Sequence, residues 1–457
     1  MSSSTRGSTV DLLHGPVVPS LIRFSIPIIL SNIFQQLYNT ADTVLVGHLL
    51  GETSLAAIGA STPIYDLLVG FAIGVGNGLA LVTARCLGKG DEDQLKRSVA
   101  GSLLLALGIC LMVTLGSLLG ATSLLRVLNT PENVLPEASG YIVIILGACT
   151  VTVAYNLLSA LMRAVGNSVA PMVFLLISSV LNIGLDALLL SVTDLGVKGA
   201  AIATVISQGI SVVGSILYIL RRCRILLPAR RHFVPDRELY ADMLGQGLSM
   251  GLMGSLVSAG SLALQSGINS MGYLVIAGHA TARKLFSFST IPFFAVGIGM
   301  STFASQNRGA NQCDRIRHAV KQVGLLDVGI AALFFVFMLL FSRSLAEAVS
   351  GSHEEVLISN CSRYLIFCSP FFAVLGSLVN FRYCLQGLGA KRLPLISSAI
   401  EMIGKIVFVS LLVPKYGYDA IICCEPCLWI IMTLQLAWSF YTHPLIQACR
   451  PMKKPVV

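Results

Sequence analysis

The chain has 457 residues, of which 55% are hydrophobic and only 12% are charged, and its mean hydropathy is +0.80. Because a soluble protein carries roughly twice that share of charged residues, the composition excludes an ordinary soluble domain. The net charge of +9 would suit a nucleic-acid partner only if the basic residues gathered in one region, so their positions along the chain decide that question.

Twelve apolar stretches follow one another along the chain, each close to or above the roughly 20 residues that a spanning helix needs. The first six are 19–47, 54–83, 98–121, 138–163, 169–192 and 198–220, and the second six are 243–270, 275–304, 319–342, 358–385, 393–413 and 418–441. They predict an all-α polytopic membrane protein with twelve transmembrane helices. The polar opening before residue 19 is not typical of a cleavable signal peptide, so we expect the first stretch to remain as a helix.

Lys and Arg residues concentrate in the termini and in the even-numbered loops between these stretches. Examples are Arg85 and Lys89 after the second stretch, Arg221 and Arg222 after the sixth, and Arg308 after the eighth. The positive-inside rule then predicts a multi-pass protein of the inner (cytoplasmic) membrane with both termini in the cytoplasm. The basic excess therefore indicates topology and not a nucleic-acid partner.

An internal repeat relates the two sets of stretches at an offset of about 221–223 residues. The matching pairs are Gly76 and Gly297, Gly78 and Gly299, Gly88 and Gly309, Tyr141 and Tyr364, Gly166 and Gly389, Pro171 and Pro394, and Gly196 and Gly417. Six-helix repeats keep the same orientation, and such parallel repeats are typical of transporters with a substrate pathway between the halves. The predicted domains are an N-terminal six-helix lobe (1–220), a basic cytoplasmic linker (221–242), a C-terminal six-helix lobe (243–441) and a cytoplasmic tail (442–457).

Polar and acidic side chains interrupt three stretches of the N-terminal lobe at the spacing of one helix face. They are Gln35, Tyr38, Asn39 and Asp42 in the first stretch, Asn182 and Asp186 in the fifth, and Thr204 and Gln208 in the sixth. At about 1.5 Å per residue, Asp42, Asp186 and Thr204 fall at one depth in the outer half of the membrane. We therefore expect two carboxylates, an amide and a hydroxyl to converge in this lobe.

Such a group can act in two ways. Two nearby carboxylates repel, so that one of them binds a proton readily, or their oxygens ligate a small hard cation such as Na⁺. For Asn182 and Thr204 the alternative is that they only hold helices together by hydrogen bonds. Pro27, inside the first stretch, removes a backbone hydrogen bond and either lets the helix bend during function or causes a static kink.

The C-terminal lobe carries intramembrane charges of both signs, namely Arg283, Lys284, Glu401, Lys405 and Glu425. In the repeat alignment Lys405 takes the position of Asn182, and Glu425 that of Thr204. We expect a largely self-neutralised network that is structural or holds a conformation. Cation coupling is accordingly assigned to the N-terminal lobe.

Four motifs span both halves: QLYNTADTVLVG from Gln36 to Gly47, Pro171 with LNIGLD at 181–186, GVKGAAIAT at 196–204, and QNRGA at 306–310. Together they resemble the multidrug and toxic compound extrusion (MATE) family, in its bacterial DinF-type branch. The resemblance implies a V-shaped pair of six-helix bundles that exports amphipathic, often cationic compounds by alternating access. It also implies a coupling site for H⁺ or Na⁺ at Asp42, Asn182, Asp186 and Thr204, with Tyr38 and Asn156 lining the lobe. The seventh stretch holds no acidic residue, so a NorM-type cation site is not expected in the C-terminal lobe.

The expected function is therefore a secondary active multidrug efflux antiporter with no cofactor other than its coupling ion. The alternative is a flippase for lipid-linked precursors, for which the cationic residues Arg283, Lys284, Arg363, Arg382 and Lys405 would line the cavity. The expected partners are small amphipathic or cationic substrates and the lipid bilayer, and a monomer is expected. No nucleophile–base pair or phosphate-binding GxxxxGK[ST] loop indicates an enzyme.

Overall fold

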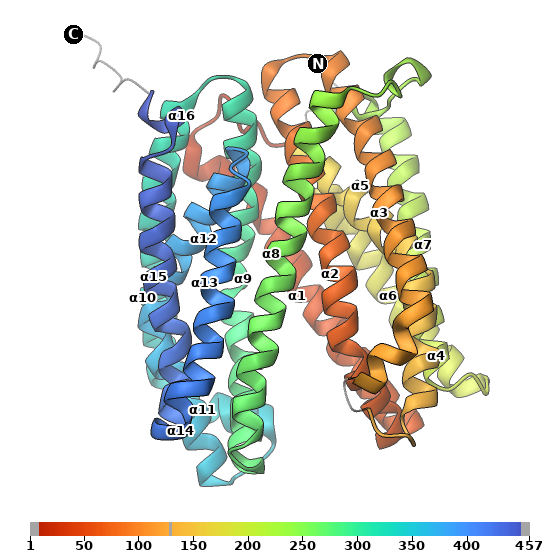
Figure 1. Cartoon of the computed structure of the whole chain (residues 1–457), viewed down its shortest axis with the longest axis vertical. Coiled ribbons are helices and arrows are strands. Elements are labelled where there is room, and N and C mark those ends of the chain that lie inside the picture. Colours follow the sequence, from red (N-terminus) through yellow and green to blue (C-terminus); the bar gives the residue numbers. More distant parts are fainter. Residues whose placement is uncertain (1–8, 128–129, 449–457) are drawn as a thin grey trace. The chain divides into compact units, whose positions relative to one another are not determined.

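The computed structural model describes residues 9–127 and 130–448, which are almost entirely helical and contain no strand (Figure 1). The first repeat is formed by α1 (Val17–Leu50), α2 (Glu52–Lys89), α3 (Glu92–Val127), α4 (Leu135–Gly147), α5 (Cys149–Ala164), α6 (Val169–Val192) and α7 (Val197–Arg222). Two short 3₁₀ helices, η2 (Arg224–Leu226) and η3 (Arg230–His232), connect the repeats.

The second repeat begins with α8 (Arg237–Asn269), α9 (Tyr273–Gly309) and α10 (Cys313–Ser350). It continues through α11 (Glu355–Cys368), the 3₁₀ turn η4 (Ser369–Phe371), α12 (Phe372–Gly387), α13 (Arg392–Val407), the π-helical turn η5 (Phe408–Leu412), α14 (Val413–Tyr416) and α15 (Tyr418–Tyr441). A short α16 (Pro444–Gln447) follows.

Eleven helices in the described part of the chain are long and apolar enough to cross a membrane, and the count becomes twelve when α4 and α5 are one bent span. This confirms the predicted all-α fold, in which every backbone polar group can be paired within a helix, as the bilayer requires. The stretch expected as one helix at 138–163 differs, because α4 and α5 meet at an angle of 48°. The break lies at Ala148, directly after Gly147, and sharp bends are common at glycine.

Aligned glycines mark the same turns in both repeats. Gly166 and Gly389 follow α5 and α12 with φ of 87° and 70°, and Gly196 and Gly417 precede α7 and α15 with φ of 54° and 57°. Glycine adopts such left-handed angles at little cost, unlike other residues. The repeat detected in the sequence therefore reflects shared backbone geometry.

The described residues form two compact units. The first comprises residues 9–11 and 26–255, and the second comprises 12–25 and 256–448. The first helix of each repeat is thus divided, and its opening part belongs to the unit formed by the other repeat. Close packing explains this: a Cβ on Gly78 of α2 would lie 2.7 Å from Gly247 Cα of α8, and a Cβ on Gly299 of α9 would lie 2.9 Å from Ser25 Oγ of α1.

One helix is central in each unit, α2 in the first and α9 in the second. Within the most apolar segment of each helix, 61% of the residues of α2 and 67% of those of α9 are buried, against 22% for α10. In the first unit α2 packs on α3, α4 and α5, while α6 and α7 lie along each other. The candidate coupling residues Asp42, Asn182, Asp186 and Thr204 lie on the other three helices, α1, α6 and α7.

Candidate functional site

The three helices that carry the candidate coupling residues meet in the first unit. They share a small buried apolar cluster, which consists of Val46 of α1, Leu190 of α6 and Ala200 of α7. Asp42 lies one helical turn before the first of these, Asp186 one turn before the second, and Thr204 one turn after the third. Because side chains four residues apart share a helix face, the cluster places these three polar residues in a neighbouring layer.

Two carboxyl groups face each other in that layer. Asp42 and Asp186 are direct electrostatic neighbours, and Asp186 is 0% exposed. One turn before Asp186 on α6, the buried Asn182 donates a hydrogen bond from Nδ2 to Thr204 Oγ1 at 3.3 Å. The structure thus brings all four candidate coupling residues into one polar centre.

This centre is rich in acceptors that lack donors. Within residues 9–127 and 130–448, no hydrogen-bond partner is found for Asp42 Oδ1, for Asn182 Oδ1 or for either carboxyl oxygen of Asp186. Leaving such oxygens buried without a partner is costly. A proton shared by the carboxyl pair would satisfy them, and so would a small cation, since oxygen atoms are the ligands that hard cations prefer.

Aromatic hydroxyl groups surround the acidic pair. Tyr38 of α1 and Tyr141 of α4 are electrostatic neighbours of both Asp42 and Asp186, and Tyr65 of α2 lies next to both tyrosines. Tyr38 was expected from its helix face. The other two were not, although Tyr141 carries a signal in the sequence, because it aligns with Tyr364 in the repeat.

The remaining lobe-lining candidates do not join the acidic pair through any contact in the described residues. Gln35 and Asn39 are exposed on α1, and Asn156 donates to the Thr152 carbonyl of its own helix α5 at 2.8 Å. Gln208 accepts a hydrogen bond from Thr152 Oγ1 at 2.7 Å, which links α7 to α5. For Gln208 the contact is therefore of the kind that holds helices together.

Pro27 lies where α1 passes from one unit to the other. The helix continues through it without interruption from Val17 to Leu50, while the division between the units falls between Ser25 and Ile26. Ser31 Oγ donates to the Pro27 carbonyl at 2.7 Å. A proline weakens helical hydrogen bonding at this point, so bending of α1 would be easiest at the boundary of the units.

The second unit holds the mixed-charge network. Arg283 of α9 donates to both Glu425 oxygens of α15, at 2.9 and 2.8 Å, and Tyr364 of α11 donates to Glu425 Oε2 at 2.8 Å. Lys405 of α13 lies 2.9 Å from Glu401 Oε1 and 3.7 Å from Glu425 Oε1. Each acidic group here is opposed by at least one cation, in contrast to the first unit.

Two residues differ from the expected membership of this network. Lys284 is exposed and forms no ion pair in the described part of the chain, so the structure does not bring it in. Arg382 of α12, which sequence reasoning placed only in the flippase alternative, lies 3.6 Å from Glu401 Oε2 and donates to Ser397 Oγ at 2.8 Å. Sequence reasoning grouped Lys284 with Arg283 because both lie in the same stretch. Consecutive residues on a helix point in different directions, and only Arg283, which is partly buried, pairs with Glu425.

Two repeats of membrane-spanning helices, each with a buried polar centre on corresponding helices, define a polytopic membrane transport protein. The MatE family profile matches residues 27–188 and 250–411. It thus matches each repeat once, at the offset that the sequence indicated. The chain belongs to the MatE family, the multidrug and toxic compound extrusion transporters.

Relatives cover nearly the whole chain. "Probable multidrug resistance protein YpnP" of Bacillus subtilis is 29% identical over 81% of this chain and 82% of its own length. "Multidrug export protein MepA" of Staphylococcus saprophyticus is 24% identical over 82% and 83%. A solved outward-facing multidrug resistance MATE family transporter covers 96% of this chain and 98% of its own, with a TM-score of 0.87 and 23% identity. The last comparison shows a shared fold.

Proposed function

We propose that this chain is a secondary active antiporter that exports amphipathic or cationic compounds in exchange for H⁺ or Na⁺. The observation that carries the proposal is the Asp42–Asp186 pair, whose buried oxygens lack donors in the described residues. Such a pair binds a cation or proton because binding removes both the repulsion and the unsatisfied acceptors. We infer from the positive-inside rule that the chain lies in the inner (cytoplasmic) membrane with both termini in the cytoplasm.

Ion binding would couple to a change of conformation through the helices that carry the pair. Asp42 stands on α1, and Asp186 and Asn182 stand on α6. A ligand shifts a conformational equilibrium only by its difference in affinity for the two states. We infer that the loaded and empty pair prefer different separations of α1 from α6, and that the bend allowed at Pro27 accommodates the difference. Binding of H⁺ or Na⁺ would neutralise the pair, and this would drive the exchange of the exported compound for the ion.

The flippase alternative is not favoured. The named relatives are multidrug resistance and export proteins, which supports small exported compounds as substrates. A site for a pyrophosphate-bearing lipid also needs free cationic side chains. Of the five cations considered for that alternative, Arg283 is paired with Glu425, Arg382 and Lys405 with Glu401, and Arg363 with Asp419. This leaves Lys284 as the one without an ion pair in the described residues.

The test is export of a fluorescent lipophilic cation by the purified chain in liposomes. A pH gradient and a Na⁺ gradient are imposed separately on wild type, Asp42→Asn and Asp186→Asn. We expect transport under one gradient only, and loss of transport in both variants, because each removes one member of the pair. The matched control is Asp66→Asn, which changes an exposed acid of α2 and is expected to transport normally.

Two results would overturn the proposal. One is gradient-driven export that survives in both aspartate variants. The other is loss of coupled export in Glu425→Gln while Asp42→Asn stays active, since this would move coupling to the second unit. Binding of the fluorescent cation to protein in detergent, measured for each variant, separates a loss of coupling from a loss of substrate affinity.

A further inference from the structure

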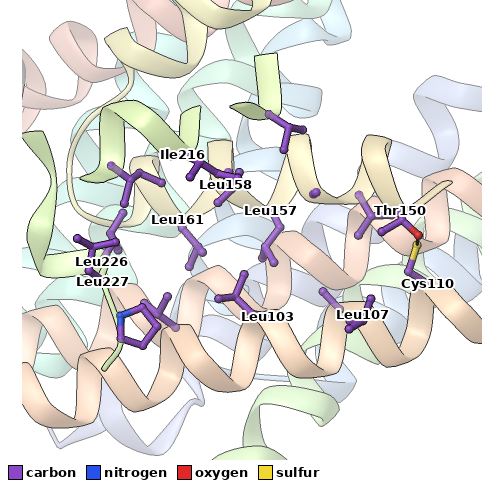
Figure 2. A pocket seen from close by; sticks show the side chains of 17 residues that line it. Leu103, Leu107, Cys110, Thr150, Leu157, Leu158, Leu161, Ile216, Leu226 and Leu227 are labelled. Carbon is purple, nitrogen blue, oxygen red and sulfur yellow. Dashed lines mark hydrogen bonds between the residues drawn. The ribbon is translucent and has the colours of Figure 1, made fainter. Parts of the chain in front are cut away.

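An elongated apolar cavity of about 460 Å³ lies in the first unit between α3, α5 and α7. Figure 2 shows its leucine-rich walls, with Leu226 and Leu227 at one end and Cys110 and Thr150 at the other. Cys110 Sγ and Thr150 Oγ1, 3.4 Å apart, satisfy each other at that end. No acidic or basic side chain is among the residues that line the cavity.

The cavity has the length of one leaflet and opens sideways. On α3 its lining runs from Val99 to Cys110, which is about 16 Å along the helix and close to half of the roughly 30 Å hydrocarbon core. Leu157 at its floor is 2% exposed, whereas Leu107 and Ile216 at its rim are 47% and 44% exposed. In a bilayer such a rim faces hydrocarbon, so the groove is open to lipid.

The end of the groove near Leu226 is closed by a linker that is fixed in place. Leu226 and His232 are both 2% exposed. The His232 ring accepts a hydrogen bond from the Ala229 N–H at 2.8 Å, and its Nε2 lies 3.2 Å from Asp93 Oδ1 at the start of α3. The segment η2–η3 is therefore held against the unit, and its residues Leu226 and Leu227 line the closed end of the groove.

Arginines without an ion pair in the described residues stand close in the chain to the residues that line this end. Arg221, Arg222, Arg224 and Arg230 are exposed, and in residues 9–127 and 130–448 none of them forms an ion pair. On α7, Arg222 continues the face of Ile219, which lines the groove, because residues three apart are neighbours on a helix. Positive groups therefore lie within one turn of the apolar lining, on the side that the predicted topology assigns to the cytoplasm.

We propose that this groove binds one acyl chain of an anionic phospholipid of the cytoplasmic leaflet, with its phosphate held by Arg222 and Arg224. The apolar walls suit an alkyl chain and exclude water, which needs polar partners in a cavity. An exported cation would find no counter-charge there, whereas anionic lipids are attracted by arginine clusters beside a spanning helix. Phe233 and Val234, exposed by 41% and 52%, give the same linker an apolar edge toward the membrane.

Native mass spectrometry of the purified full-length chain tests this proposal with phosphatidylglycerol and phosphatidylcholine of identical acyl chains. Arg222→Gln with Arg224→Gln should lower phosphatidylglycerol affinity about tenfold or more and leave phosphatidylcholine unchanged. Ala154→Phe fills the groove and should lower retention of both lipids. The controls are Arg392→Gln, an exposed arginine of the second unit, and Val213→Phe, which enlarges a residue of α7 that is 57% exposed and does not line the groove.

Ala106→Leu, a smaller filling change at a lining residue that is 5% exposed, keeps the test valid if the Phe variant does not fold. Equal retention of the two lipids by wild type would overturn the charge assignment, and unchanged retention in both filled variants would overturn the groove. Loss of fluorescent-cation export in the filled variants without any change in lipid retention would assign the groove to exported compounds instead.

Discussion

Two glycine pairs on α2 and α8 allow these helices to cross closely in the first unit, and this crossing predicts a stability effect. Gly74 and Gly78 are four residues apart on α2, and Gly247 and Gly251 are four apart on α8. A Cβ on Gly74 would lie 2.8 Å from Gly251 Cα, and a Cβ on Gly78 would lie 2.7 Å from the Gln246 carbonyl oxygen. These neighbours are backbone atoms, which cannot rotate away.

The expected magnitude follows from the distances. Carbon atoms in contact are normally about 3.5–4.0 Å apart, so alanine at Gly74 forces the helices to separate by roughly 0.7–1.2 Å. Overpacking of this kind costs about 1–3 kcal/mol per site, and small residues provide much of the packing between membrane helices. We expect the double variant Gly74→Ala with Gly78→Ala to lose about 2–6 kcal/mol, or roughly 4–24 °C in Tm at about 2–4 °C per kcal/mol for a unit of this size.

The assay is thermal unfolding of purified protein in one detergent, compared with Gly70→Ala. Gly70 lies one turn before Gly74 on the same helix, and an added Cβ there meets nothing within 4 Å. It therefore controls for the change in helix propensity. A double variant as stable as wild type would refute the packing argument, and so would an equal loss in Gly70→Ala.

Two further predictions concern charged groups of the second unit. Glu425→Gln leaves Arg283 and Lys405 without their shared carboxylate and should cost about 3 kcal/mol of stability, measured as a lower Tm. The control Glu355→Gln removes an exposed ion pair and should cost less than about 1 kcal/mol. Equal losses in the two variants would contradict this prediction. Burial lowers the pKa of the His443 imidazole, so the unfolded chain binds the proton more readily and stability should fall as the pH drops below about 6.5. His443→Gln should flatten Tm against pH on that acidic side, and an unchanged slope would show that another group is responsible.

The fold was predictable because a bilayer allows few alternatives. Length and hydropathy alone located the spanning helices, and the aligned glycines fixed the repeat. The division of α1 and α8 between the units was not predictable from hydropathy. It depends on which glycine meets which neighbouring helix, as at Gly78 against the backbone of α8 and Gly299 against side chains of α1. The four-residue spacing of Gly74 and Gly78, and of Gly247 and Gly251, was nevertheless a readable signal for close helix packing.

The polar centre was predictable where periodicity and depth coincide. Asp42 and Asp186 were located by counting turns from the outer ends of their helices. Tyr65 was missed because it belongs to none of the motifs and aligned pairs that singled out the other residues. Lys284 was wrongly grouped with Arg283 because intramembrane position says nothing about which way a side chain points, and the structure exposes it.

The corresponding positions of the two repeats argue for coupling in one unit only. Tyr141, Asn182 and Thr204 surround the carboxyl pair of the first unit, and their repeat partners Tyr364, Lys405 and Glu425 form the network of the second. In that network Glu425 already has its cations, so an arriving proton or Na⁺ must displace Arg283 or Lys405 to bind there. In the first unit Asp42 and Asp186 form no ion pair with any described Lys or Arg, and binding requires no such displacement. In the proposed antiporter the ion therefore acts on α1 and α6, while the network of Arg283, Lys405 and Glu425 keeps the same charge state throughout the cycle.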